Sequence, residues 1–207
     1  MQPFIEGLAG ASAFISVGLA AIAVAQHREV RSLARLASVE PLSGLLNRRE
    51  FMRALDAEVA RASRGSGGFA VVLADVDGLK LINDSCGHRG GDRAILRVAN
   101  ALRVSVRASD TAGRIGGDEF AVVLPGAGDA AARRFLARVH SVLARHRRAG
   151  SVTVSGGIAV YPGHGVTGDA LLETADASLY ADKVRRSRRT PASIPRLVPG
   201  SLREAVQ

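Results

Sequence analysis

The sequence RIGGDEFAVVLP, residues Arg114–Pro125, places two glycines and two adjacent carboxylates directly before an apolar run. The run from Phe120 to Leu124 has no polar residue, which predicts a buried strand over residues 119–124. Gly116 and Gly117 suit a tight hairpin turn, because glycine accepts positive φ. The two acids that follow would therefore stand at the rim of the sheet. Since successive strand residues point to opposite faces, we expect these two acids to have different roles.

Carboxylates mark the end of a second predicted strand. The stretch FAVVLADVD, residues 69–77, ends in Asp75 and Asp77. Ligands commonly bind at the carboxyl ends of strands in α/β sheets. If this strand lies beside the first, Asp75 and Asp118 meet across the two. Two carboxylates and a backbone carbonyl suit Mg²⁺, which keeps some waters and binds substrate phosphates. The alternative is that each Asp only caps a turn.

Helices and strands alternate through the middle of the chain. The predicted helices cover residues 51–64, 90–108, 129–147 and 168–185, and the predicted strands cover residues 69–76, 119–124 and 152–160. Strands separated by helices predict an α/β fold with one central sheet.

The N-terminal segment Gly7–Ala25 is 19 residues long and carries no charge, which is about the length of a membrane-spanning helix. Basic residues follow this segment and none precedes it. The positive-inside rule therefore places the N-terminus outside and the rest of the chain in the cytoplasm. Residues 1–26 are thus predicted to be a single-pass anchor in the inner (cytoplasmic) membrane. A signal peptide ending near Ala25 and a buried core helix are the alternatives.

Two further segments flank the predicted globular domain. Residues 27–39 form a predicted helical linker, either a dimerising stalk or a solvated connector. Residues 188–207 contain three prolines and are predicted to be a disordered basic tail. The domain between them covers residues 40–187.

Composition limits the classes of function. The chain of 207 residues carries a net charge of +9, and such basic chains often bind nucleic acid or anionic lipid. Much of this excess lies in residues 185–207, which hold six Arg and one Glu. Aromatic residues make up only 4% of the chain, so no stacking platform for single strands is evident, and we expect no nucleic-acid partner. The single cysteine, Cys86, excludes an internal disulfide framework.

Lysine is rare among the basic residues. Of the 28 Lys and Arg residues only Lys80 and Lys183 are lysine, which suggests a role specific to lysine. The turn Gly78-Leu79-Lys80 offers backbone N–H groups and an ammonium, which together suit a phosphate. An ordinary Asp-Gly turn is the alternative.

The next segment, LINDSCGHRGGDRA, contains a polar pair. Asn83 and Asp92 flank a glycine-rich turn, and an amide with a carboxylate matches the hydrogen-bonding groups of guanine. Alternatively, Asp92 is the N-cap of the helix that follows.

Residues 40–183 resemble the GGDEF-domain diguanylate cyclases, which condense two GTP into cyclic di-GMP and release pyrophosphate. The GGDEF sequence is intact, and four further segments resemble family motifs: EPLSGLLNRR, DVDGLKLIND, GHRGGD and VTVSGGIAVYP. The resemblance implies an α/β domain whose central, mainly antiparallel sheet is flanked by helices, as in palm-like nucleotidyl cyclases.

The resemblance also implies roles for individual residues. Asp75, the Val76 carbonyl and Asp118 would hold Mg²⁺, or Mn²⁺ in its place. Glu119 would deprotonate the attacking 3′-hydroxyl or help to hold the metal. The phosphate-binding residues would be Gly78, Leu79, Lys80 and Lys183, and the guanine-reading residues Asn83 and Asp92, supported by His88.

Two partner interactions follow from the same resemblance. Each domain would bind one GTP, so catalysis would need a homodimer, and a membrane anchor would raise the local concentration of the second domain. Arg107 and Asp110 resemble the RxxD site at which cyclic di-GMP inhibits the family, with Arg138 as a second arginine contact. An ordinary surface pair is the alternative for so short a motif.

The chain departs from the family pattern at several positions. Glu40, Ser43 and Leu79 replace the usual Asp, Thr and Phe. Arg186 and Ser187 stand where the family has Gly-Arg after the lysine, in the segment KVRRSRR. A phosphate-binding arginine is therefore either missing or supplied by Arg188. The rival functions are a degenerate GGDEF domain that binds cyclic di-GMP or GTP, and a module that binds nucleic acid or lipid through its arginine tail.

Overall fold

Strand β2 (Phe69–Val76) lies inside a five-stranded sheet with the strand order β1-β3-β4-β2-β5. All eight of its residues are buried, as expected for a strand that is covered on both faces. Its neighbours β4 (Glu119–Pro125) and β5 (Val154–Tyr161) both run antiparallel to it. The structure, a computed structural model, describes residues 38–65, 67–145 and 152–189.

Two short strands complete the sheet and were not predicted. β3 (Thr111–Arg114) pairs antiparallel with β4, and β1 (Leu46–Asn47) pairs parallel with β3. Strands of four and two residues are too short to display an alternating pattern. The mainly antiparallel sheet implied by the family resemblance is nevertheless confirmed.

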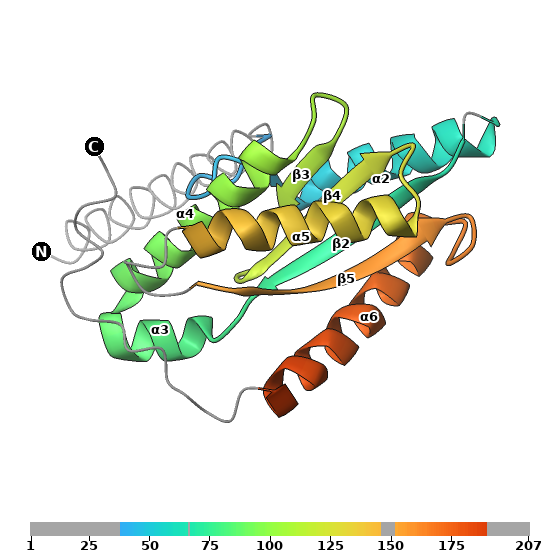
Figure 1. The fold of residues 1–207 in the computed structure, drawn as a ribbon. Helices are drawn as coiled ribbons and strands as arrows, with labels where there is room; N and C mark the ends of the chain where they lie inside the picture. Colours follow the sequence, from blue (N-terminus) through green and yellow to red (C-terminus); the bar gives the residue numbers. More distant parts are fainter. Residues whose placement is uncertain (1–37, 66, 146–151, 190–207) are drawn as a thin grey trace, which may run out of the picture. The chain divides into compact units, whose positions relative to one another are not determined.

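In the part of the chain that the structure describes, five helices cover the two faces of the sheet (Figure 1). They are α2 (Arg48–Ser63), α3 (Leu79–Cys86), α4 (His88–Ser105), α5 (Asp129–Arg145) and α6 (Gly168–Arg189). One core contains Val71 and Leu73 of β2 with apolar residues of α2 and α6. The other contains Val72 and Ala74 with apolar residues of α3, α4 and α5. The alternation along β2 thus places α6 and α5 on opposite faces.

The predicted helices and strands are present, with different bounds for some. Helix α3 was not predicted as a separate element. It follows Gly78, whose φ of 69° lies in the left-handed region that favours glycine. Lys80 consequently lies in the first turn of a helix and not in a flexible turn. Helix α4 begins at His88, so Asp92 lies inside the helix and is not its N-cap.

Helix α6 packs directly on the backbone of β5. A Cβ atom added at Gly157 would overlap the carbonyl oxygen of Ala175 and would lie 2.5 Å from the amide nitrogen of Leu179. On the other face, a Cβ at Gly156 would overlap the side chain of Leu136 in α5. The two adjacent glycines therefore let both helices approach the same strand.

The flanking segments of the sequence lie outside the described residues. The chain divides into two compact units, residues 1–38 and 39–207, and the sheet belongs to the second. The predicted anchor, nearly all of the predicted linker and the tail beyond Arg189 are therefore not described. Within the described ranges no helix has the length and hydropathy needed to cross a bilayer.

Candidate active site

The strand register brings the predicted carboxylates to one end of the sheet. Asp75 of β2 lies opposite Glu119 of β4, and the amide of Val76 donates to the carbonyl oxygen of Asp118 at 3.1 Å. Asp75 is buried, with 7% of its surface exposed, whereas Glu119 is exposed. The two strands are neighbours, as the proposed meeting of Asp75 and Asp118 requires. The carboxylate of Asp75 is thus largely shielded from solvent, whereas that of Glu119 is open to it.

An ammonium from α6 reaches the buried carboxylate. Lys183 Nζ lies 2.9 Å from Asp75 Oδ2. Burial raises the pKa of Asp75, and the charges of Asp118 and Asp77 act in the same direction, although Lys183 opposes them. Burial lowers the pKa of Lys183, but its hydrogen bond to Asp75 and the negative charges nearby outweigh burial and raise it. Three carboxylates, Asp75, Asp77 and Asp118, thus lie close enough to interact, and the positive charge of Lys183 partly offsets their repulsion.

Asp77 is joined by three hydrogen bonds to Ser155 of β5 and to Thr153, the residue before that strand. Its carboxylate accepts from Thr153 Oγ1 at 2.7 Å and from Ser155 Oγ at 2.6 Å, and its amide donates to the Thr153 carbonyl at 2.9 Å. These contacts fix the chain at the point where it leaves β2 and enters α3. The sequence analysis did not assign this role to Thr153 and Ser155, although two hydroxyl residues at alternate positions of a strand are a recognisable signal.

The first glycine of the GGDEF segment is constrained for a different reason from the one predicted. Gly116 and Gly117 both lack a positive φ. The hairpin closes through the amides of Ile115 and Gly116, which donate to the Glu119 carbonyl at 2.9 and 3.3 Å. A Cβ at Gly116 would overlap Glu119 Oε2, while one at Gly117 would meet nothing within 4 Å. Gly116 therefore leaves room for the Glu119 carboxylate.

Arg114 joins this hairpin to the first family motif. Its Nε and Nη2 donate to the Gly117 carbonyl at 3.2 and 2.6 Å, and its Nη1 lies 3.0 Å from Glu40 Oε2. Glu40 also accepts from the amides of Leu42 and Ser43 at 3.1 and 2.8 Å. Burial would raise the pKa of Glu40, but hydrogen bonds from Ser43, Leu42 and Arg114 lower it to about 2. The sequence analysis did not predict this connection.

The depressed pKa of Glu40 predicts a pH-dependent contribution to stability. A carboxylate whose pKa falls on folding stabilises the fold above its unfolded pKa of 4.5, and the contribution disappears as pH falls toward about 2. We expect Glu40→Gln to lower the free energy of unfolding by about 1 kcal/mol at pH 7, allowing for solvent screening. Urea denaturation from pH 7 to pH 3 should show this difference shrinking below pH 4.5. Asp129→Asn, at an exposed ion pair with Arg133, is the control. A difference independent of pH would contradict the role of the charge.

The predicted guanine-binding pair lies where α3 and α4 pack against each other. A Cβ at Gly91 would overlap Asn83 Oδ1, so the Asn83 amide lies against the backbone next to Asp92. The side chain of Asp92 is exposed, as are His88 and Lys80. Asn83 lies three residues after Lys80 in α3, on the same side of the helix. The glycines of GHRGGD thus permit this close approach.

The RxxD segment forms a turn at the end of α4. Asp110 Oδ2 accepts from the amide of Arg107 at 2.8 Å, and the Asp110 amide donates to the Arg107 carbonyl at 3.0 Å. Arg138 of α5 reaches the same place, since its Nη2 donates to the Ser105 carbonyl at 2.6 Å. The guanidinium of Arg107 is exposed. The three predicted residues therefore come from two elements that meet at this turn.

The donors at the carboxylate end suit a divalent metal ion. Among the side chains that the structure describes, no three from His, Cys, Asp and Glu are grouped to hold a metal ion. The predicted set uses two carboxylates, Asp75 and Asp118, with the carbonyl of Val76, so it does not need such a group. Lys183 already places one cation on Asp75. Hard oxygen donors and accumulated negative charge are the features that Mg²⁺ requires.

Comparison with known proteins identifies the family. Residues 37–189 match the family described as "Diguanylate cyclase, GGDEF domain". The diguanylate cyclase TpbB of Pseudomonas aeruginosa is 40% identical over 169 residues, which cover 78% of this chain and 39% of that protein. The diguanylate cyclase DgcP of the same species is 36% identical over 166 residues, covering 78% of this chain and 25% of that protein. This chain belongs to the GGDEF-domain diguanylate cyclase family.

A solved structure shows the same fold. The GGDEF domain of DgcB from Caulobacter crescentus, crystallised in complex with c-di-GMP, has a TM-score of 0.67 and 32% identity to this chain. The match covers 72% of this chain and 91% of that one. The relatives are longer proteins: the match covers only 39% of TpbB and 25% of DgcP.

Proposed function

We propose that this chain is a diguanylate cyclase that condenses two molecules of GTP into cyclic di-GMP and releases two molecules of pyrophosphate. The observation that carries the proposal is the group of charged residues at one end of the sheet. It combines the buried Asp75, the adjacent strand end with Asp118 and Glu119, and the ammonium of Lys183. Family membership and named cyclase relatives support the same assignment.

In this proposal the site performs an in-line attack on the α-phosphorus of GTP. The 3′-hydroxyl oxygen of one GTP forms a bond to the α-phosphorus of the other, and the bond to pyrophosphate breaks. Glu119 accepts the hydroxyl proton, which its exposed position at the rim permits. A second attack, in which the two nucleotides exchange roles, closes the ring and releases the second pyrophosphate. A bound Mg²⁺ would offset the charge that develops on the phosphate.

The remaining residues bind and orient the nucleotide. The amides of the first turn of α3, after Gly78, are not used within the helix and point to its N-terminal side, which favours phosphate oxygens. Lys80 in this turn and Lys183 on α6 would add two positive charges. Asn83 and Asp92 would hold the guanine, since the Asn83 side chain lies against Gly91, the residue before Asp92, where α3 meets α4.

The assembly that we propose is a homodimer, in which each domain contributes one GTP. Residues 1–26 would anchor it in the inner membrane with the domain in the cytoplasm. Such an anchor would confine the domains to two dimensions and favour their encounter. Cyclic di-GMP would act both as the product and as an inhibitor bound at Arg107, Asp110 and Arg138. Structures of relatives hold this ligand, including that of the DgcB domain.

The proposal is tested by product analysis. The full chain, purified in detergent, is incubated with GTP and Mg²⁺ over a range of protein concentrations, and nucleotides and pyrophosphate are measured. Cyclic di-GMP with two pyrophosphates per product, formed at a rate that rises more than linearly with protein, supports a dimeric cyclase. If GTP binds and no product forms, even when a fused coiled coil enforces dimerisation, the cyclase proposal fails.

A receptor without catalytic activity is the second candidate. It is favoured by the segment KVRRSRR, in which Arg186 and Ser187 replace the Gly-Arg of the family. Leu79, which packs partly buried against the core beneath α4 and α5, is a second departure from the pattern. Tight binding of cyclic di-GMP or GTP without turnover would establish this function.

The proposed inhibitory site makes a separate prediction. Arg107→Ala should weaken inhibition by cyclic di-GMP about tenfold or more, because a guanidinium that binds a phosphate contributes strongly to affinity. The initial rate and the melting temperature should not change, since the turn is held by backbone contacts with Asp110. Arg133→Ala removes another exposed arginine and is the control. Unchanged inhibition in Arg107→Ala would remove this site from the proposal.

A further inference from the structure

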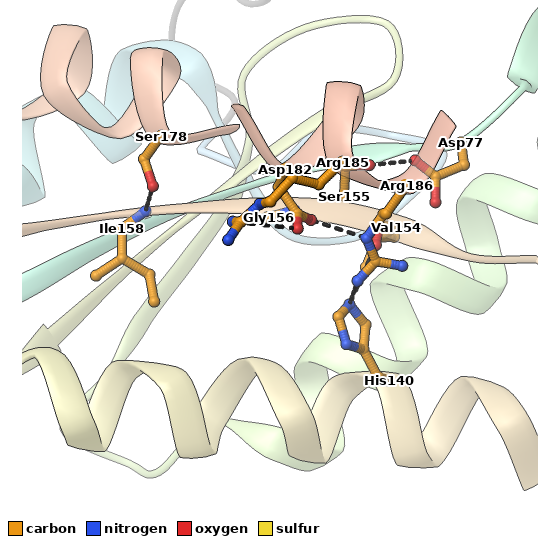
Figure 2. A network of polar contacts seen from close by, with 10 residues as sticks. All are labelled: Asp77, His140, Val154, Ser155, Gly156, Ile158, Ser178, Asp182, Arg185 and Arg186. Carbon is orange, nitrogen blue, oxygen red and sulfur yellow. Dashed lines mark hydrogen bonds and ion pairs between the residues drawn. The ribbon is translucent and has the colours of Figure 1, made fainter. Parts of the chain in front are cut away.

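Side chains of α6 occupy the outer edge of β5, which is the last strand of the sheet. The amide of Gly156 donates to Asp182 Oδ2 at 3.2 Å, and the amide of Ile158 donates to Ser178 Oγ at 3.3 Å (Figure 2). Ser178 and Asp182 lie one helical turn apart, which matches the spacing of alternate residues along the strand. These bonds fix α6 along the edge of β5.

Arg186 extends this attachment to the opposite face of the sheet. Its Nε lies 2.8 Å from Asp182 Oδ2, one turn back along α6. Its Nη2 lies 3.3 Å from Nε2 of His140, a residue of α5. The same His140 nitrogen lies 3.1 Å from the carbonyl oxygen of Val154, the first residue of β5 (Figure 2). Because α5 and α6 cover opposite faces, these contacts pass around the edge of β5. We call Asp182, Arg186 and His140 the edge clasp.

His140 lies between a hydrogen-bond acceptor, the Val154 carbonyl oxygen, and a donor, Arg186 Nη2. Burial and the charge of Arg186 lower the pKa of His140, so its ring is neutral at pH 7. A neutral Nε2 donates to Val154 in one tautomer or accepts from Arg186 in the other. A glutamine side chain, which has separate donor and acceptor atoms, can satisfy both partners at once.

Two residues of the clasp flank Lys183, the residue that reaches the buried carboxylate. Lys183 lies directly after Asp182 and one turn before Arg186 on α6. Gly156, which Asp182 binds, lies opposite Ala74, and the next pair in the register is Ser155 with Asp75. The strand position that Asp182 holds is thus adjacent to the carboxylate that Lys183 contacts at 2.9 Å.

We infer that Arg186, acting with Asp182 and His140, is a positioning residue that holds the Lys183 ammonium at Asp75. Two of the nitrogens of Arg186, Nε and Nη2, already contact Asp182 and His140, and its side chain is 38% exposed. Arg186 therefore acts through Lys183 and is not the phosphate-binding arginine that the family has one position later. This inference rests on the proposed function, because it assigns Lys183 to the substrate phosphates.

The two lysines of the chain allow a test that needs no catalytic activity. A small amine-reactive label modifies a lysine more readily when no partner holds its side chain, and mass spectrometry of peptides separates Lys80 from Lys183. In Arg186→Met and in His140→Leu, we expect acylation of Lys183 to rise about fivefold relative to Lys80, as expected when an ammonium loses a charge-assisted hydrogen bond. His140→Gln should restore the original ratio. An unchanged ratio in both Arg186→Met and His140→Leu would overturn the inference.

Kinetics distinguish positioning from direct phosphate binding. If Arg186 acts through Lys183, Arg186→Met should raise the KM for GTP about fivefold in the original chain and should not raise it further in Lys183→Met. Independent phosphate binding by Arg186 would make the two effects multiply, which would overturn the inference. A fall in melting temperature with no change in KM or in the acylation ratio would show only a structural role.

The proposed function and this inference can fail separately. If the chain makes no cyclic di-GMP, the proposed cyclase fails, and the acylation ratio still decides whether the clasp holds Lys183. If the chain is an active cyclase and neither the acylation ratio nor the KM responds to Arg186→Met, the inference fails alone. Melting curves of each variant show whether the domain is folded, and the reactivity of Lys80 monitors the labelling.

Discussion

Glu119→Gln should reduce the formation of cyclic di-GMP by at least about a hundredfold while the domain remains folded. Glutamine has nearly the same shape as glutamate but cannot accept the proton of the attacking hydroxyl, and loss of such a group typically costs this much. The hairpin should survive, because its hydrogen bonds use the backbone carbonyl of Glu119 and not its carboxylate. Initial rates at saturating GTP, together with melting curves, measure the effect.

A carboxylate elsewhere in the domain provides a control that makes this prediction specific. Glu50 lies at the start of α2, where its carboxylate contacts Arg49 and Arg53, and the proposed mechanism gives it no role. Glu50→Gln should therefore leave the rate almost unchanged. GTP binding by Glu119→Gln, measured by calorimetry, should remain. If Glu119→Gln keeps most of its activity, then Glu119 neither accepts the proton nor holds the metal, and the proposed mechanism fails.

Gly157→Ala should destabilise the domain by about 3 kcal/mol or more, which is at the upper end for a single added methyl group. The new Cβ would overlap the carbonyl oxygen of Ala175 and lie 2.5 Å from the amide nitrogen of Leu179. Both atoms belong to the backbone of α6 and cannot rotate away. Helix α6 would have to move from β5, so the melting temperature should fall by about 10 °C.

Two other glycines provide graded controls. Gly156→Ala meets only the flexible side chain of Leu136, so the cost should be smaller than at Gly157. Gly163→Ala has only a carbonyl oxygen at 3.9 Å as its neighbour and should change the melting temperature little. An equal effect at all three positions would show that loss of glycine flexibility matters and that the contact between helix and strand does not.

The sequence was sufficient to predict the parts of the fold that have long, uniform patterns. The strands around Asp75 and Glu119 are continuous apolar runs, and their ends carry the acids, so their meeting could be predicted from topology alone. Strands β1 and β3 are too short for such a signal, and their pairing depends on the rest of the sheet. Helix α3 was not predicted because half of its eight residues are polar and so short a segment shows little helical periodicity.

Asp75 and Glu119 lie at the strand ends where the sequence placed them, whereas Lys80 and Asn83 lie in a helix that was not predicted. Several supporting contacts could not be predicted either. Arg114 binds Glu40 across more than seventy residues of chain, and no local pattern links them. His140 and Arg186 come from helices on opposite faces, so only the packed structure brings them together. The glycine pair of the GGDEF segment was predicted to need positive φ, whereas at Gly116 the space is taken by the Glu119 carboxylate.

The capped edge of β5 also limits how copies of this protein associate. A strand edge with unpaired amides is a template on which another chain can extend the sheet, which leads to polymers and aggregates. On β5 the amides of Gly156 and Ile158 already donate to Asp182 and Ser178, and the opposite edge strand, β1, has only two residues. The bonded amides therefore hinder pairing of another strand with β5, and β1 offers only two residues for pairing. Two such domains can therefore approach each other without fusing into a continuous sheet.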